Sequence, residues 1–196
     1  MPLIHIMSTI AKATLLSSIL LSASCASSKN IKSIDSCPSL EMKSLPLVES
    51  QAMPTSEWQS MTLGSQIEIP FLSGTKYIMD SGPILSVELQ EKRITYRMID
   101  GDEIKFIGSD KSPNTYFRDA INTPSGMECA FVEAFRNSDE KWRTTINGLE
   151  VYIFSEGDNY KAYLMSPKID FVTELLVRGA SLSELTRLVK NTYIVE

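Results

Sequence analysis

The chain has 196 residues and is acidic, with 24 Asp and Glu residues, 19 Lys and Arg residues and a formal net charge of −5. No basic cluster interrupts this balance, so the chain lacks the excess cations that bind a phosphate backbone, and we expect no nucleic-acid partner. The single histidine, His5, lies in the N-terminal leader. Once that leader is removed, Ser-His-Asp and Cys-His catalysis and His-ligated zinc or haem sites are excluded.

The leader is an apolar run, Ala13–Ala23, that ends just before Cys25. It is shorter than the roughly 20 apolar residues of a membrane-spanning helix, and the small residues after it are typical of an export signal. The segment resembles a bacterial lipoprotein signal, although Leu21 stands four places before the cysteine and the family prefers three. The resemblance implies a signal peptide over residues 1–24, lipidation of Cys25 and a lipid anchor on the periplasmic face of the outer membrane. Ordinary cleavage after Ala26 is the alternative.

Cys37 and Cys129 remain after either kind of processing, because lipidation uses Cys25 and cleavage after Ala26 discards it. An oxidising compartment favours a disulfide between them. Such a bridge would connect the N-terminal tether to the middle of the domain and stabilise the fold by about 3–5 kcal/mol through loop closure. Two unpaired thiols, with Cys129 buried in a helix, are the alternative.

Residues 25–57 are expected to form a tether and an extended N-terminal segment. The stretch 26–36 is small and polar, and the stretch 37–57 contains three prolines and no clear period. A single folded domain is therefore predicted over residues 58–196, a length that can bury a sizeable core.

The first half of this domain shows strand-like patterns. Gln66–Ile69 alternates polar and apolar residues and is predicted to stop at Pro70. The segments Ile84–Leu89, Arg93–Ile99 and Glu103–Ile107 are predicted to form a three-stranded meander, with one polar face and one packed face.

Two helices are predicted in the centre of the chain. Ser112-Pro113 fits an N-cap followed by proline at the first helical position. The second helix is expected over Met127–Arg136, where the apolar residues at helical spacing are Met127, Phe131, Ala134 and Phe135.

A second meander and a last helix complete the chain. The expected strands are Leu149–Ser155, Tyr160–Met165 and Ile169–Val177, and the first is apolar on both faces, which predicts a central strand covered by helices. The last helix begins at Ser181–Glu184, which fits a capping box.

This order of elements, with hairpin-length connections, predicts an α+β fold: a mainly antiparallel sheet with flanking helices, in a single-domain α-β-α sandwich. The arrangement resembles that of the PsbP/Mog1-like group, which includes exported bacterial lipoproteins and toxin-immunity proteins. The resemblance covers residues 58–196, follows from element order, and implies no functional residue.

The candidate contact residues are two acidic turns and one tryptophan. The spacing of the acidic residues lacks the alternating ligands and closing Glu of an EF-hand loop, so hairpin turns are favoured over metal sites. The tryptophan lies in a charged segment after Ser138-Asp139-Glu140-Lys141, which we expect to be a solvated loop rather than a Ser-x-x-Lys catalytic motif. It is either an exposed interface anchor or a side chain packed over a sheet edge. The candidates are Trp142, Asp100, Asp102, Glu103, Glu156 and Asp158.

These features predict a non-enzymatic binding protein of the cell envelope, without a metal or other cofactor. Its most specific form is an immunity protein that blocks an antibacterial effector arriving in the periplasm, where the acidic turns would meet a basic partner. One alternative is an envelope assembly or accessory lipoprotein that binds a membrane complex or a hydrophobic ligand. Another is a hydrolase that uses two converging carboxylates in a deep cleft.

Overall fold

The computed structural model describes residues 37–45, 58–64, 66–72, 75–89 and 91–195, all within one unit that spans Ile34–Glu196. The predicted signal peptide, the lipidation site Cys25 and most of the tether lie outside these residues. Part of the predicted tether, residues 37–45, belongs to this unit.

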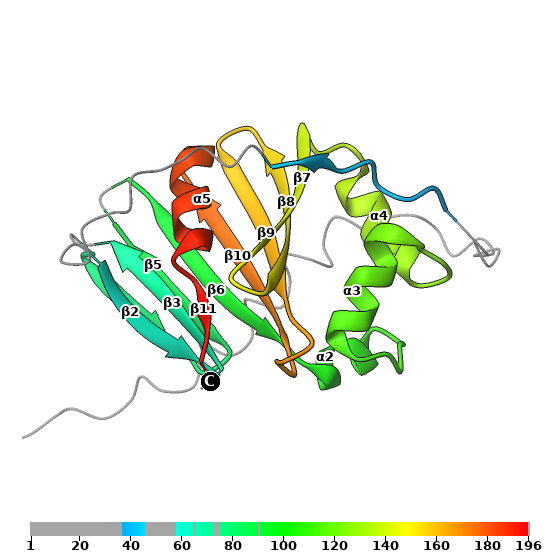
Figure 1. Cartoon of the computed structure of the whole chain (residues 1–196), viewed down its shortest axis with the longest axis horizontal. Coiled ribbons are helices and arrows are strands. Elements are labelled where there is room, and N and C mark those ends of the chain that lie inside the picture. Colours follow the sequence, from blue (N-terminus) through cyan, green and yellow to red (C-terminus); the bar gives the residue numbers. More distant parts are fainter. Residues whose placement is uncertain (1–36, 46–57, 65, 73–74, 90, 196) are drawn as a thin grey trace, which may run out of the picture. The chain divides into compact units, whose positions relative to one another are not determined.

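The described residues form an eight-stranded sheet in the order β1-β7-β8-β9-β10-β6-β5-β4 (Figure 1). Every neighbouring pair is antiparallel except β1 and β7, which are parallel. The predicted α+β class with a mainly antiparallel sheet is therefore confirmed. The strands are β1 (Lys43–Ser44), β4 (Tyr77–Asp80), β5 (Ile84–Glu88), β6 (Arg93–Ile99), β7 (Glu140–Ile146), β8 (Leu149–Glu156), β9 (Asn159–Met165) and β10 (Val172–Arg178).

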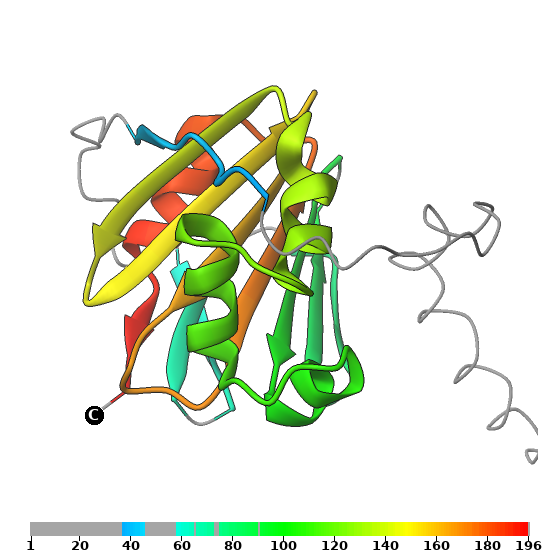
Figure 2. The ribbon, with the colours of Figure 1, turned by 90° about the vertical axis from the view of Figure 1, so that its right-hand side faces the viewer.

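Helices lie on both faces of this sheet. On one face, α3 (Pro113–Asn122) and α4 (Glu128–Arg136) pack over β8 and β9, and α2 (Gly101–Phe106) follows the end of β6 (Figure 2). On the other face lie α5 (Leu182–Lys190) and a second, three-stranded sheet. The second sheet has the order β11-β3-β2 and consists of β2 (Trp58–Leu63), β3 (Ile67–Leu72) and β11 (Tyr193–Ile194).

The core lies on both sides of β8, as its doubly apolar sequence predicts. Val151 and Ile153 face the cluster shared with α5 and β3, whereas Tyr152 and Phe154 face α3 and α4. The second cluster is rich in aromatic rings; Phe154, for example, lies 4.2 Å from Phe135, measured between ring centroids.

The predicted helix starts are also confirmed. Ser112 caps α3 directly before Pro113, and Ser181 and Glu184 form both hydrogen bonds of a capping box at α5. Gly179, just before α5, has φ 72°, and a Cβ atom there would lie 2.6 Å from the Glu91 carbonyl oxygen. Glycine is thus required on steric grounds at this turn.

The predicted strand Glu103–Ile107 is wrong, because these residues belong to α2 and the turn that follows it. The Asp100 carboxylate accepts hydrogen bonds from the backbone N–H groups of Asp102 and Glu103, both at 3.0 Å. Asp100 is therefore a helix N-cap rather than part of a hairpin turn. Its carboxylate pairs with backbone N–H groups of the first turn of α2, which have no hydrogen-bond partner within the helix.

Three smaller predictions also need correction. β3 continues through Pro70 instead of stopping there; β11 pairs only with Ile67 and Glu68, so Pro70 lies beyond the part of β3 that is paired on both sides. The solvated loop predicted at 138–141 ends early, since β7 begins at Glu140. Helix α4 is present, but its buried face carries Cys129, Val132 and Phe135, while Met127 and Ala134 of the predicted stripe are exposed.

Candidate functional site

A disulfide joins Cys37 to Cys129, with the two Cα atoms 5.8 Å apart, and these are the two cysteines that the sequence pairs. Cys129 lies in the first turn of α4, so the bridge attaches residues 37–45 (blue in Figures 1 and 2) to the domain. The same segment buries Leu40 and pairs β1 with the edge of β7. The N-terminal segment is thus fixed to the fold by a covalent bond and by packing.

The two acidic clusters lie at opposite ends of the sheet. Asp100 follows Ile99, which pairs with Val172 at the start of β10, whereas Asn159, in the second cluster's hairpin, pairs with Arg178 at the end of β10. Strands rise by about 3.3 Å per residue, so about 20 Å separates the two ends. The structure does not bring the predicted contact residues together into one site.

Trp142 is buried, with 9% of its surface exposed, and it packs in the core cluster that contains Leu45. It lies on β7, opposite Lys43 of β1 and Ile153 of β8. Of the two alternatives from sequence, the structure therefore supports the packed side chain, and Trp142 is not accessible to a partner.

Glu156 and Asp158 are exposed on the hairpin between β8 and β9. The hairpin is held by its backbone: Gly157 N–H donates to Asp139 at 2.8 Å, and the Asp158 carbonyl accepts from Gly179 N–H at 3.2 Å. These two carboxylates remain candidate contacts, but no exposed large apolar side chain of the described residues lies on this hairpin.

The first acidic cluster lies beside exposed apolar side chains. The Asp102 side chain is 93% exposed, and Phe106, four residues later on the same face of α2, is 77% exposed. Ile107 and Met127 are exposed next to them; a Cβ atom at Gly108 would lie 3.9 Å from the Met127 side chain, which places Met127 beside the turn after α2. We refer to Asp102, Phe106, Ile107 and Met127 as the α2 patch.

Helix α2 is anchored firmly beneath this patch. Ile104 is buried, and Glu103 forms an ion pair with Arg97 of β6. Arg97 also contacts the buried carboxylate of Glu174 at 3.4 Å, and the Tyr163 hydroxyl donates to Glu174 at 3.0 Å. Burial, together with the Glu174 charge, raises the pKa of Tyr163 well above its usual value. Glu103 is consequently an internal ion-pair partner rather than a free contact residue.

This network also bears on the hydrolase alternative. Glu103 and Glu174 do converge, but the Arg97 guanidinium occupies the space between their carboxylates. These carboxylates pair with Arg97, and Glu174 also lies 3.7 Å from Lys161, so they form a structural ion-pair network. Glycoside cleavage instead needs two carboxylates on either side of a substrate.

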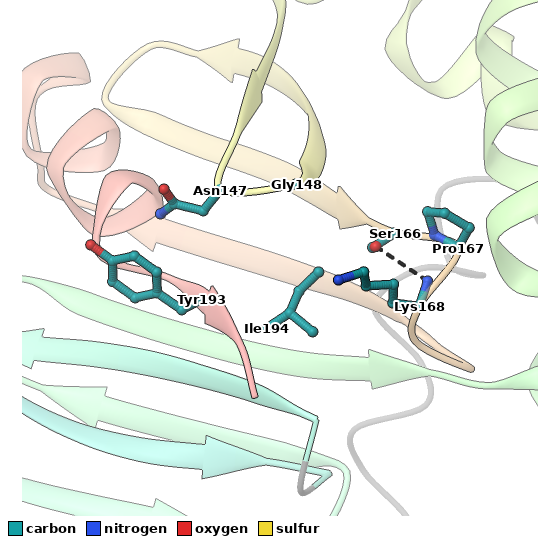
Figure 3. Close-up of a pocket in the computed structure, with 7 residues that line it drawn as sticks. All are labelled: Asn147, Gly148, Ser166, Pro167, Lys168, Tyr193 and Ile194. Carbon is teal, nitrogen blue, oxygen red and sulfur yellow. Dashed lines mark hydrogen bonds between the residues drawn. The ribbon is translucent and has the colours of Figure 1, made fainter. Parts of the chain in front are cut away.

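A pocket of about 340 Å³ lies where the β7–β8 turn, the β9–β10 connection and β11 meet (Figure 3). The Asn147 side-chain amide donates to the carbonyl oxygens of Lys190 and Thr192 at 2.8 and 2.9 Å, which ties this turn to the end of α5. The Lys168 side chain extends toward Ile194 (Figure 3). The lining residues are Asn147, Gly148, Ser166, Pro167, Lys168, Tyr193 and Ile194.

Within the described ranges, no group of three or more His, Cys, Asp and Glu side chains is placed to hold a metal ion. In the same part of the chain, no helix is both long and apolar enough to span a membrane. Comparisons with protein-family models, with curated proteins and with solved structures gave no match.

The sequence interpretation missed the apolar half of the α2 patch because it assigned Phe106 and Ile107 to a strand and Met127 to the apolar stripe of a helix. A signal was present: Asp100 is followed three residues later by Glu103, the spacing of a helix start. A helix beginning there puts Asp102 and Phe106 on one face.

Proposed function

We propose that this chain is an exported, lipid-anchored, non-enzymatic protein of the bacterial cell envelope that binds a basic protein partner. In its specific form, the partner is an antibacterial effector that reaches the periplasm, and the chain is the immunity protein that neutralises it by covering its surface. The observation that carries the proposal is the α2 patch, in which an exposed phenyl ring lies beside an exposed carboxylate.

The energetics favour a protein interface at this patch. A phenylalanine side chain gains about 1.5–3 kcal/mol when it is moved from water into an apolar environment, and aromatic residues are typical interface anchors. Phe106 leaves this gain unrealised in the isolated chain. The Asp100 cap and the Glu103–Arg97 ion pair hold α2 in place, so binding requires little ordering of the backbone.

Charge indicates the chemistry of the partner. Asp102 stands almost fully exposed at the patch and pairs there only with the exposed Lys105, at 3.7 Å, among the described residues; the chain as a whole carries a net charge of −5. A complementary, basic surface would associate faster and dock in a defined orientation.

The disulfide supports the proposed compartment. Disulfides persist in oxidising environments such as the periplasm and are rare in the cytosol. The Cys37–Cys129 bridge begins 12 residues after Cys25, the proposed lipid anchor. An anchored domain in the periplasm would meet an incoming effector there.

The direct test is binding to an effector, which the proposal expects to be encoded next to this chain's gene. We expect Phe106→Ala to weaken the affinity about 30-fold or more, as for an interface hot spot, and Asp102→Lys to weaken it about tenfold. Tyr193→Ala is the matched control, because it removes an exposed aromatic ring outside the patch. Equal affinity for the Phe106 and Tyr193 variants would contradict the assignment of this surface.

The pocket beside β11 favours the accessory lipoprotein as a second candidate function. Its volume is at the small end of ligand sites, and Pro167, Tyr193 and Ile194 supply apolar walls. In that case Tyr193→Ala, and not Phe106→Ala, would abolish function. The pair of variants therefore separates the two proposals.

A further inference from the structure

Strand β4 forms one edge of the eight-stranded sheet, and all four of its residues are exposed. Tyr77 and Met79 are 53% and 58% exposed, and Ile78 between them is also exposed. The other edge strand, β1, is only two residues long, Lys43–Ser44. An exposed apolar edge strand is a template for pairing with another chain.

The free edge of β4 presents its backbone at alternate residues. Ser81 N–H donates to Ile84 O at 2.9 Å, at the point where β4 turns into β5. The Lys76 N–H, before the start of β4, donates to Glu88 O of β5 at 2.9 Å. Within β4 the hydrogen bonds alternate as in any antiparallel pair, so the N–H and C=O groups of Ile78 and Asp80 point away from β5. They can bond to an added strand without disturbing the existing sheet.

We infer that β4 pairs with the β4 of a second copy of this chain, antiparallel and about a two-fold axis through Ile78. In this register Ile78 lies opposite Ile78 of the second copy, and Tyr77 lies opposite Met79. Lys76 lies opposite Asp80 of the second copy. By symmetry, the Tyr77–Met79 pair and the Lys76–Asp80 pair each occur twice in the interface. The segment is therefore self-complementary in both charge and apolar contact, as an isologous interface requires.

The alternative registers are poorer. A two-fold axis normal to the sheet keeps each face continuous, so the axis must pass through a single residue. An axis at Tyr77 places Lys76 opposite Ile78, and an axis at Met79 places Asp80 opposite Ile78; both leave the charges unpaired. One oxygen of the Asp80 carboxylate accepts a hydrogen bond from Gly82 N–H at 2.9 Å. In the Ile78 register, the other oxygen can form an ion pair with Lys76 of the second copy.

This pairing is separate from the α2 patch and does not depend on the proposed function. It continues the sheet across two chains at β4, whereas α2 follows the end of β6, which β5 separates from that edge. Two anchored copies would present two α2 patches.

The test is a charge swap between two differently tagged, full-length copies that are co-expressed, exported and co-purified in mild detergent. Wild-type copies are expected to associate. Lys76→Asp alone brings two carboxylates opposite each other, and Asp80→Lys alone brings two ammonium groups opposite each other, so each variant is expected to self-associate at least about tenfold more weakly. Mixing one Lys76→Asp copy with one Asp80→Lys copy gives two opposite-charge pairs, one in the wild-type order and one reversed. This mixture is expected to restore association relative to either variant alone.

Asp158→Lys, a charge reversal on the distant β8–β9 hairpin, is the matched control and is expected to associate like the wild type. Ile78→Lys provides a second, independent disruption, because it places two lysines at the axis. The inference is overturned if wild-type copies do not associate, if the mixed pair associates no better than the single variants, or if Ile78→Lys has no effect.

Discussion

Removal of the Cys37–Cys129 bridge gives the sharpest stability prediction. The bridge spans 92 residues of sequence. In the loop-entropy account, opening a loop of that length in the unfolded chain costs about 4–5 kcal/mol of stability at 25 °C. Small domains are stable by only about 5–15 kcal/mol in total, so the Cys37→Ala, Cys129→Ala double variant is expected to lose a large share of its stability.

Equilibrium urea unfolding measures this loss. Trp142 is buried beside Leu45, which belongs to the segment that the bridge attaches, so tryptophan fluorescence reports on the relevant packing. With a slope of about 2 kcal/mol per M urea, the midpoint is expected to fall by about 2 M. A reductant should shift the wild type and leave the double variant unchanged. A loss below about 1 kcal/mol, or an equal response of both proteins to reductant, would refute the reasoning.

Two further predictions concern an ion pair and a glycine. Lys111→Met is expected to lower the free energy of unfolding by about 1–2 kcal/mol at pH 7, because the buried Glu128 carboxylate loses a hydrogen bond of 2.6 Å. The expected loss is modest because Lys111 is partly exposed. Although burial opposes its charge, the hydrogen bond from Lys111 lowers the pKa of Glu128. The stabilisation by the Glu128–Lys111 pair is therefore present above the ordinary Glu pKa of 4.5 and is lost as the pH falls through the lower pKa of Glu128 in the folded state. Urea unfolding of the wild type and of Lys111→Met should accordingly give the same stability at acid pH. Gly179→Ala is expected to lower the free energy of unfolding by about 1–3 kcal/mol, because its Cβ would meet the Glu91 carbonyl oxygen. Gly157→Ala is the control, because Gly157 has a similar positive φ but open space around it. Thermal unfolding should show a smaller loss of stability for Gly157→Ala. Equal losses for the two glycine variants would contradict the steric argument.

Much of the fold was predictable where local sequence and tertiary structure agree. The capping box at Ser181 and Glu184 and the doubly apolar β8 are local patterns whose physical reason is also local. The cap and the apolar strand need no knowledge of distant residues. For the disulfide, counting the cysteines left after the predicted leader favoured the pair, with two unpaired thiols as the alternative.

The wrong predictions fall where a distant contact or a cap decides the outcome. β7 has a charged sequence and becomes a strand because β8 and β1 pair with its two sides. Glu103–Ile107 has strand-like alternation, but the Asp100 cap and the Glu103 ion pair make it helical. The buried face of α4 differs from the predicted stripe, and it includes Cys129, which forms the bridge to residue 37.

The candidate site was predictable only in part. Sequence singled out Asp100, Asp102 and Glu103, but assigned all three the same role as contacts. The structure separates a cap, an exposed carboxylate and an internal ion-pair partner. The exposure of Phe106 and Met127 depends on how α2, α3 and α4 pack, and no local pattern encodes it.

The most direct measurement of the central claim is survival under attack by sister cells that deliver an effector, which the proposal expects to be encoded beside this chain's gene. A strain that lacks this chain would carry the wild type, Phe106→Ala or Tyr193→Ala, with equal amounts in the envelope verified by immunoblot. The account predicts that the empty strain and the Phe106→Ala strain are killed, while the wild type and Tyr193→Ala protect. Survival of the empty strain, or full protection by Phe106→Ala, would contradict it.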